Sequence, residues 1–550
     1  MRKTFITILL TMAGAVGYAQ SAYDGLLFSE NNYEGTARSV AMGNAFTALG
    51  GDLGSITINP AGSAVAGYSQ FTITPGLTIA SSNAQGVSPF TDGSLPYFER
   101  KMQSSMARFS IPNMGLTINW DTGRTSGLKN MTFGFVVNKA ASYDQDVYAS
   151  GLNSTTSFMG AMATECSCIL PDCPHIYCIR ENHPGYLYED LNAADAYNFI
   201  PRWDAIVGYQ SGMISTFGGY DDKYVGASEL IFDNGDIVLG GDIEQTYGRR
   251  TKGGKFDYVF NFGANISDFL YLGANLGLSS TNYSYDDYFK EAAVDPADFE
   301  IALDNGENMY FSQMRHRYWY EADVSGIYAK FGAILTPGYG LRIGAAIQTP
   351  VTNTVVERWQ YSGSTEFTSA EYDGYAYSPE GEYSYVFNSP MRANLGIAYT
   401  FGDFAVISAD YELCNYGQMR FMEDRNGQSD YFDDLNENIK DVFGLQNIWR
   451  FGAEAKFGAL AVRGGYGFST SPEKHFDGTY RSNWSFGLGY SSKGSFYADF
   501  AVRKNSYNNE YYMPYNDYIF NDDGTIADPV PEILITRSDW KVLMTFGWRF

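Results

Sequence analysis

Apolar and polar residues alternate along most of the chain beyond residue 68, and this pattern predicts its main elements. Successive side chains of an extended backbone point to opposite faces, so alternate apolar residues share one face. Each run is about as long as the roughly 9–11 residues that a tilted membrane-spanning strand needs. We predict an all-β fold, a transmembrane barrel of fourteen antiparallel strands near 68–80, 106–120, 130–142, 255–266, 269–281, 317–335, 340–349, 390–402, 404–414, 447–457, 459–468, 482–492, 495–504 and 539–550.

The connections between these strands alternate between short and long. This alternation of loop lengths is typical of outer-membrane barrels, which have short periplasmic turns and long external loops. It is not expected of a soluble β-sandwich. Residues 238–250 also look extended, but a fifteenth strand would leave one barrel end on the wrong side, so we place them in a loop as a hairpin or a strand extension. The short turns lie at 267–268, 337–339, 402–403, 458 and 493–494, and the long loops near 81–105, 143–254, 282–316, 350–389, 415–446, 469–481 and 505–538.

The last ten residues carry the most specific signal. An outer-membrane barrel needs a terminal strand with an apolar outer face and a final aromatic residue for insertion and closure. The alternative is the last strand of a soluble β protein. We predict that the lipid bilayer and the barrel-assembly machinery are partners of this strand. The face assigned to lipid holds Val542, Met544, Phe546, Trp548 and Phe550, and the assembly signal is Phe546, Trp548 and Phe550.

Residues 1–19 have the pattern of a secretory signal peptide. Arg2 and Lys3 precede an apolar run from Phe5 to Val16, and a small-x-small cleavage site ends at Ala19. A membrane anchor is disfavoured because the run is shorter than the ~20 residues of a spanning helix. We expect the mature protein to begin at Gln20 and to reach the bacterial outer membrane.

Composition agrees with a barrel. Aromatic residues make up 16% of the chain, including 44 Tyr, whose rings suit lipid while their hydroxyls suit water at the barrel rims. The net charge of −25 argues against a nucleic-acid partner.

Residues 20–67 do not alternate and are rich in small side chains. This segment is too small to bury a core alone. Attached to the first strand, it would fit inside the lumen as a plug. The predicted organisation is therefore a signal peptide at 1–19, a plug at 20–67 and a barrel at 68–550.

Ordered motifs along the mature chain resemble the FadL/TodX family of outer-membrane transporters for long-chain fatty acids and aromatic hydrocarbons. The version in Bacteroidetes-type bacteria is the most similar. The motifs resembling the family's N-terminal hatch are 35–43, Gly50-Gly51-Asp52 and Asn59-Pro60-Ala61-Gly62, and further likeness lies at 340–344, 349–350, 389–392, 408–412 and 463–466.

The resemblance implies a fourteen-stranded barrel plugged by the hatch, with a side opening through which an apolar ligand leaves into the membrane. A fatty acid gains nothing from a water-filled channel, because its chain is poorly hydrated. The implied function is passive transport of hydrophobic or amphipathic small molecules, fatty-acid-like in kind, with lateral release. No cofactor is implied.

Hatch and gating roles are expected for Arg38, Asp52 and the Asn59-Pro60-Ala61-Gly62 motif. Asn59 and Pro60 either break the hatch backbone and seat it, or only turn the chain into the first strand, since Pro fixes φ and lacks an N–H. Arg38 and Asp52 are costly inside a lumen unless they are paired. We expect both to pair with lumen groups, as part of a latch rather than of the ligand site.

The loop at 143–254 is longer than the family needs, and it holds a cysteine cluster around His175. Zinc is disfavoured because one residue between Cys166 and Cys168 is tighter than usual structural pairs. An oxidising compartment favours two disulfides, in any of three connectivities. Cys414 is expected to be a free, partly buried thiol. The loop either caps the mouth or is a stapled surface loop without a role. The disulfide candidates are Cys166, Cys168, Cys173 and Cys178.

An enzyme is not expected. The chain has four His and no hydrolase, zincin or P-loop motif. A barrel phospholipase would need a Ser–His pair at the outer rim, for which Ser312 and His316 are the nearest candidates. The alternative function is a protein-binding barrel, such as the shuttle of the type IX secretion system or another outer-membrane assembly partner, which acidic, Tyr-rich loops would suit.

Overall fold

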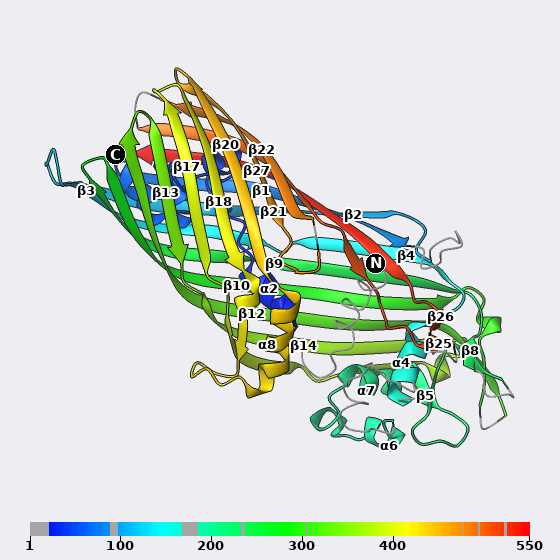
Figure 1. Cartoon of the computed structure of the whole chain (residues 1–550). Coiled ribbons are helices and arrows are strands. Elements are labelled where there is room, and N and C mark those ends of the chain that lie inside the picture. The colour runs from blue at the N-terminus through cyan, green and yellow to red at the C-terminus, as the bar shows by residue number, and fades with distance from the viewer. Residues whose placement is uncertain are drawn as a thin grey trace.

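A computed structural model describes residues 21–87, 97–167, 185–232, 237–303, 306–476, 478–492, 495–521 and 525–550. Within these ranges, fourteen antiparallel strands form a closed barrel: each spanning strand pairs with the next, and the first pairs with the last (Figure 1). The strands are β1 (Gln70–Val87), β2 (Met102–Asp121), β3 (Leu128–Ser142), β9 (Ile243–Ile266), β10 (Leu270–Ala293), β12 (Asn308–Gly338), β13 (Leu341–Gln348), β17 (Arg392–Phe401), β18 (Ala405–Asn415), β20 (Leu445–Phe457), β21 (Leu460–Thr470), β22 (Thr479–Ser491), β23 (Phe496–Tyr507) and β27 (Glu532–Arg549).

The fourteen strands predicted from alternation are confirmed, but several are longer than predicted. Residues 243–250 extend β9 outward, whereas residues 237–239 pair with residues 229–231 as a hairpin, so the ambiguous segment at 238–250 contains both expected features. The predicted loop at 282–316 was wrong over much of its length, because β10 runs to Ala293 and β12 starts at Asn308. At the long-loop end, the barrel wall therefore extends much further on the side of β9, β10 and β12 than on the opposite side (Figure 1). The predicted signal peptide and the turn at 493–494 lie outside the described residues.

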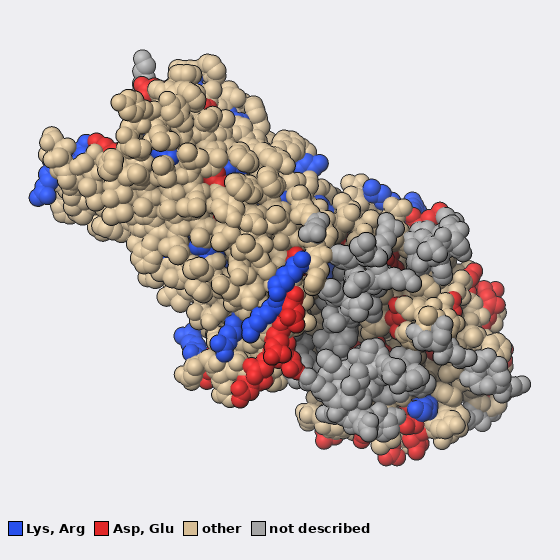
Figure 2. Space-filling model, viewed as in Figure 1, with Lys and Arg blue, Asp and Glu red and all other residues tan. Residues whose placement is uncertain are grey.

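Large apolar side chains cover the outside of the barrel near its short turns. On β27, Met544 is 45% and Trp548 41% exposed, whereas the inward-facing Leu543 is 3% exposed, as the terminal alternation predicts. Phe260 and Phe331 are also exposed at this level. Figure 2 shows this half of one face almost without charged residues, while charges gather over the opposite half. A closed barrel with such a belt is a lipid-facing, outer-membrane β-barrel.

The long-loop end carries further strands and small helices. Among the described residues, no helix is long and apolar enough to cross a membrane. The extra strands are β4 (Gln145–Asn153), β5 (Ile214–Thr216), β6 (Tyr224–Gly226), β7 (Glu229–Ile231), β8 (Ile237–Leu239), β11 (Glu300–Ala302), β14 (Thr352–Phe367), β15 (Gly374–Tyr377), β16 (Gly381–Asn388), β19 (Arg420–Met422), β24 (Glu510–Tyr512), β25 (Ile519–Phe520) and β26 (Ile526–Asp528), and the external helices are α4 (Phe158–Ser167), α6 (Tyr188–Leu191), η3 (Ala196–Asn198), α7 (Trp203–Gln210), η4 (Pro296–Asp298), η5 (Ala370–Tyr372), η6 (Tyr416–Gln418), η7 (Asp430–Phe432) and α8 (Asp433–Val442).

Candidate functional site

The N-terminal segment, residues 21–69, lies against the inner wall of the barrel. Its α3 contacts β21, β22, β23 and β27, while its η2 contacts β3, β9, β10 and β12 on the other side. Side-chain caps start its short helices: Thr36 for α3, Asp52 for η1 and Asn59 for η2. The caps and a small apolar cluster of Tyr33, Met42, Phe46, Ala48, Leu49 and Ile58, completed by Ala398 and Val406 of the wall, hold the segment together. The segment's helices are α2 (Ala22–Ser29), α3 (Ala37–Ala41), η1 (Leu53–Thr57) and η2 (Pro60–Val65).

A tier of inward-facing glycines lets the segment's backbone touch the wall. Gly263, Gly273 and Gly332 are direct cross-strand neighbours on β9, β10 and β12. A Cβ on Gly273 would overlap the backbone of Pro60 and Ala61. Such close approach is available only to glycine, so larger residues here would push the segment inward. This glycine tier comprises Gly263, Gly273, Gly332, Gly344, Gly452, Gly465 and Gly487, which face Ser63, Ala61, Asn59, Thr47, Met42, Gly43 and Ala41 respectively.

Asn59 attaches the segment to two barrel strands. Its Nδ2 donates to the carbonyl of Ala333 on β12 at 3.1 Å and of Ala345 on β13 at 3.3 Å, besides that of Thr47 at 2.7 Å. Pro60 takes the first position of η2, where its missing N–H costs nothing. Ala61 and Gly62 complete this turn and are buried. The motif therefore makes specific wall contacts, in addition to leading the chain toward β1.

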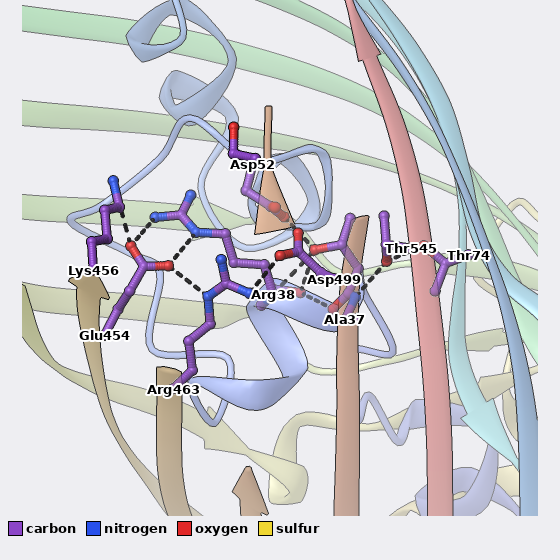
Figure 3. Close-up of polar contacts among 12 residues, drawn as sticks. Ala37, Arg38, Asp52, Thr74, Glu454, Lys456, Arg463, Asp499 and Thr545 are labelled. Atoms are coloured by element: carbon purple, nitrogen blue, oxygen red, sulfur yellow. Dashed lines mark hydrogen bonds and ion pairs between the residues drawn. The ribbon is translucent and has the colours of Figure 1, made fainter. Parts of the chain in front are cut away.

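Arg38 pairs with the wall, as expected from the sequence. Its guanidinium binds Glu454 on β20 through two hydrogen bonds of 3.0 and 3.1 Å. Glu454 also accepts from Arg463, which in turn donates to Asp499 (Figure 3). Positive and negative side chains thus alternate from Arg38 on α3 to Glu454 on β20, Arg463 on β21 and Asp499 on β23. A buried charge of either sign is tolerable here because each has an opposite partner.

Asp52, expected to pair with lumen groups, has its partners within the N-terminal segment and none on the wall among the described residues. Its Oδ1 accepts from the Thr36 hydroxyl at 2.6 Å and from the Gly54 N–H at 2.8 Å. Both partners belong to the N-terminal segment itself. Asp52 therefore organises the segment, and a short carboxylate at a helix cap prefers the adjacent N–H groups to a distant cation.

A second set of buried ion pairs joins β17, β18 and β20. Glu412 on β18 accepts from Arg392 at 2.8 Å and from Arg450 at 2.6 Å, and all three side chains are buried. Arg392 also donates to the carbonyl of Ser29, at the end of α2. Lys330 donates to the carbonyl of Thr57 at 2.8 Å. The wall therefore holds the segment by cations that bind its helix C-termini, where carbonyls lack intrahelical partners.

The wall is interrupted between β2 and β3. Among the described residues, β2 pairs with β3 only from Asn113 to Asp121, although β2 continues to Met102 and β3 to Ser142. Pro112 stands where the pairing ends, and Pro75 stands opposite it on β1 at a register shift. Proline cannot donate to a strand ladder, so paired prolines explain the divergence. The exposed Phe109 and Ile111 follow on the part of β2 that pairs with β1 but not with β3, where Arg108 forms an ion pair with Asp144 at 2.9 Å.

The N-terminal segment occupies the β3 edge that β2 leaves. The Asn32 N–H donates to the Ala140 carbonyl at 2.6 Å, and the Glu34 N–H donates to the Lys139 carbonyl at 3.0 Å. Glu34 and Lys139 form an antiparallel bridge. The Glu34 carboxylate also binds Lys541 on β27, with both side chains almost fully buried. The segment therefore fills the interruption from inside the lumen.

Tyrosine rings line the lumen beyond the segment, on β10, β12 and β14. Tyr285 stacks on Tyr320 with a 5.1 Å separation of ring centroids, and Tyr318 lies 4.5 Å from Tyr361. The Arg249 guanidinium lies 4.9 Å from the Tyr285 ring centroid. These rings pack in one cluster with Leu26 and Phe28 of α2, so they hold the start of the N-terminal segment against the wall.

Helices α4, α6 and α7 with strands β5 to β8 form an outer cap at the long-loop end (Figure 1). Cys166 on α4 is a free thiol packed in the cap's apolar cluster, and burial raises its pKa to about 12. Among the described residues, Cys166 has no disulfide partner. Cys168, Cys173 and Cys178 lie outside the described residues, so the disulfides stay a prediction there. Cys414 is free as predicted, but fully rather than partly buried.

In the described part of the chain, Ser312 and His316 form no hydrogen bond with each other. The His316 ring packs between Phe158 and Tyr361, with centroids 5.0 and 5.9 Å away. Its Nε2 has no hydrogen-bond partner among the described residues.

No protein-family model and no curated protein matches the chain. Among solved structures it is similar to the Pseudomonas putida toluene transporter TodX, at a TM-score of 0.48 and 12% identity over 94% of this chain and 99% of that one. It is similar to a Pseudomonas aeruginosa FadL homologue at 0.48 and 11%, covering 98% and 100%. It is similar to the Ralstonia pickettii toluene transporter TbuX at 0.42 and 14%, covering 94% and 99%.

Proposed function

We propose that this barrel carries apolar or amphipathic small molecules across the outer membrane and releases them sideways into the bilayer. The observation that carries the proposal is the interruption between β2 and β3 above Asn113, with the vacated β3 edge held by Asn32 and Glu34. In this proposal the N-terminal segment acts as the hatch.

The lining of the lumen supports an apolar ligand. Tyr285, Tyr318 and Tyr320 line the lumen where α2 of the hatch packs, which gives the ligand's path an aromatic wall. Below them, the glycine tier holds the hatch against the wall and opposes passage straight to the periplasm. An apolar molecule that left through the bottom would enter water, whereas a sideways exit keeps its surface away from water.

The exit is gated by a short stretch of the hatch. Two backbone hydrogen bonds hold Asn32 and Glu34 on β3, and the Glu34 carboxylate also binds Lys541 on β27. Each backbone hydrogen bond contributes only about 0.5–1.5 kcal/mol net. Release of this stretch would expose the gap without unfolding the barrel or moving η2 from the glycine tier.

Uptake in whole cells tests the function. Cells carrying the protein in an otherwise intact outer membrane should take up labelled decanol faster than cells without it, and should not become permeable to a polar solute such as sucrose. Faster entry of sucrose, or decanol uptake equal to that of cells without the protein, would contradict the proposal.

A further inference from the structure

An open groove lies at the long-loop end of the molecule, between the outer cap and β15. Its volume is about 500 Å³, which is within the range of small-molecule sites. The lining comes from the C-terminal ends of α6 and α7, from η3 and from β15. This tyrosine groove is lined by Asn192, Tyr197, Gln210, Tyr375 and Tyr377, with three alanines between them.

Two tyrosine rings of the groove are presented to solvent on one face of β15. Tyr375 is 68% and Tyr377 64% exposed, whereas Ala376 between them is buried. Their ring centroids lie 6.0 Å apart, a separation close to the length of one pyranose unit. Pairing of β15 with β14 fixes the backbone under both rings. Tyrosine side chains placed in this way offer amphipathic contact area at a low entropic cost.

The cap side of the tyrosine groove carries a phenol and two amides. The Tyr197 ring packs edge-on against Trp203, with centroids 5.5 Å apart, and its hydroxyl donates to Gln210 Oε1 at 3.5 Å. Gln210 Nε2 donates to the carbonyl of Leu191 at 3.0 Å, so this side chain is held in place. Asn192 is exposed beside them. Amide and phenol groups both donate and accept, as hydroxyl groups of a ligand require.

The chemistry of the lining selects among ligands. Among the described residues that line the tyrosine groove, none is charged, so an ionic ligand would have no partner for its charge. None of them is Leu, Ile, Val, Met or Phe, so an alkyl chain would meet no aliphatic side chain larger than alanine. A saccharide fits better, because its C–H faces pack on aromatic rings while its hydroxyls bind the polar groups around them.

We propose that the tyrosine groove binds a neutral saccharide at the outer surface. Tyr375 and Tyr377 stack on the pyranose rings, and Asn192, Tyr197 and Gln210 bind the hydroxyl groups. Free glycans and the sugars of lipopolysaccharide in the surrounding outer leaflet share this chemistry. The inference is independent of the proposed transport, because neither the hatch nor the strands that contact it line the groove.

Titration calorimetry with three saccharides tests the inference. The whole protein is purified in octaethylene glycol monododecyl ether, because this non-ionic detergent contains no sugar. The saccharides are maltohexaose, cellohexaose and the neutral outer-core oligosaccharide released from lipopolysaccharide, and at least one of them should bind. Tyr375→Ala/Tyr377→Ala should weaken that binding at least about tenfold, whereas Tyr375→Phe/Tyr377→Phe, which keeps both rings, should retain most of it.

The matched control is Tyr220→Ala, because Tyr220 is exposed on the cap but does not line the groove. It should bind the saccharides as the unchanged protein does, and the heat-modifiable band shift on gels confirms that each variant is folded. Preference for the outer-core oligosaccharide would support the site and assign it to the membrane's own glycans, and preference for a hexaose would support it and assign it to free glycans. Binding of none of the three, or equal binding by the double alanine variant, overturns the proposal. Decanol binding that is lost in the double alanine variant would also overturn it, by assigning the groove to an apolar ligand.

Discussion

Glu34 and Lys541 form a buried ion pair that joins the hatch to the last barrel strand. The pair lies next to the bridge between Glu34 and Lys139, where the hatch fills the wall. Removing one partner of a buried pair costs about 3–5 kcal/mol, because the other charge stays buried alone. Glu34→Gln should therefore loosen the stretch around Asn32 and speed hydrogen exchange of its amides.

The control for this prediction is the double variant Glu34→Gln/Lys541→Met, which removes both charges. It should restore much of the protection lost in Glu34→Gln. Exchange in Glu34→Gln that matches the unchanged protein would show that the ion pair does not hold the hatch.

The glycine tier should tolerate no side chain where the hatch backbone touches it. Gly273→Val would place its side chain in the space of Pro60 and Ala61, so η2 should leave the wall and become sensitive to protease. Gly464→Ala is the matched control, because a Cβ there meets nothing within 4 Å. Equal protease resistance of both variants would show that the tier does not position the hatch.

The assembly signal makes a separate prediction. Phe546 faces outward on β27, between the exposed Met544 and Trp548. An arginine in the middle of the lipid-facing surface costs roughly 2–4 kcal/mol. Phe546→Arg should sharply reduce the heat-modifiable barrel in outer-membrane fractions, whereas Phe546→Leu should leave it unchanged. A normal yield of folded Phe546→Arg would count against this role.

The outer cap should weaken as pH rises. Burial raises the pKa of Glu229 from 4.5 to about 7, and the Gly226 N–H, which donates to it at 2.8 Å, offsets part of this effect. The folded cap therefore retains a proton that the unfolded chain releases. Its stability is constant below about pH 4.5 and falls between about pH 4.5 and 7, by about 3 kcal/mol in total.

Limited proteolysis of the cap measures this dependence. Cleavage should be faster at pH 8 than at pH 5.5, after correction for the protease's own pH profile. Glu229→Gln should abolish the difference, since a neutral amide has no proton to lose. An unchanged pH dependence in that variant would assign the titration to another group.

Alternation was enough to predict the barrel strands because one face of each must meet lipid. The extensions of β10 and β12 were missed, since outside the membrane both faces are polar or packed and the period-two signal fades. The sequence did contain the signal for the wall interruption: Pro75 and Pro112 fall inside predicted strands, where proline indicates an edge or a bulge.

The site was harder to predict than the fold. Arg38 was expected to need a partner, but Glu454 could not be chosen because it lies more than four hundred residues away and depends on strand register. Asp52 instead accepts hydrogen bonds from Thr36 and Gly54 of its own segment. The glycine tier could have been read from glycines at lumen-facing positions near the short turns, such as Gly273 and Gly344.

The most direct test of lateral release is a reversible lock on the exit. Glu34 and Lys139 are directly opposed across the antiparallel bridge, which makes them the pair of positions at which to introduce cysteines for a disulfide. Uptake of labelled decanol by Glu34→Cys/Lys139→Cys cells should be low under oxidant and should recover with reductant. The unchanged protein, whose described cysteines Cys166 and Cys414 are buried, serves as the control. Uptake that stays high in the oxidised, cross-linked variant would contradict exit between β2 and β3.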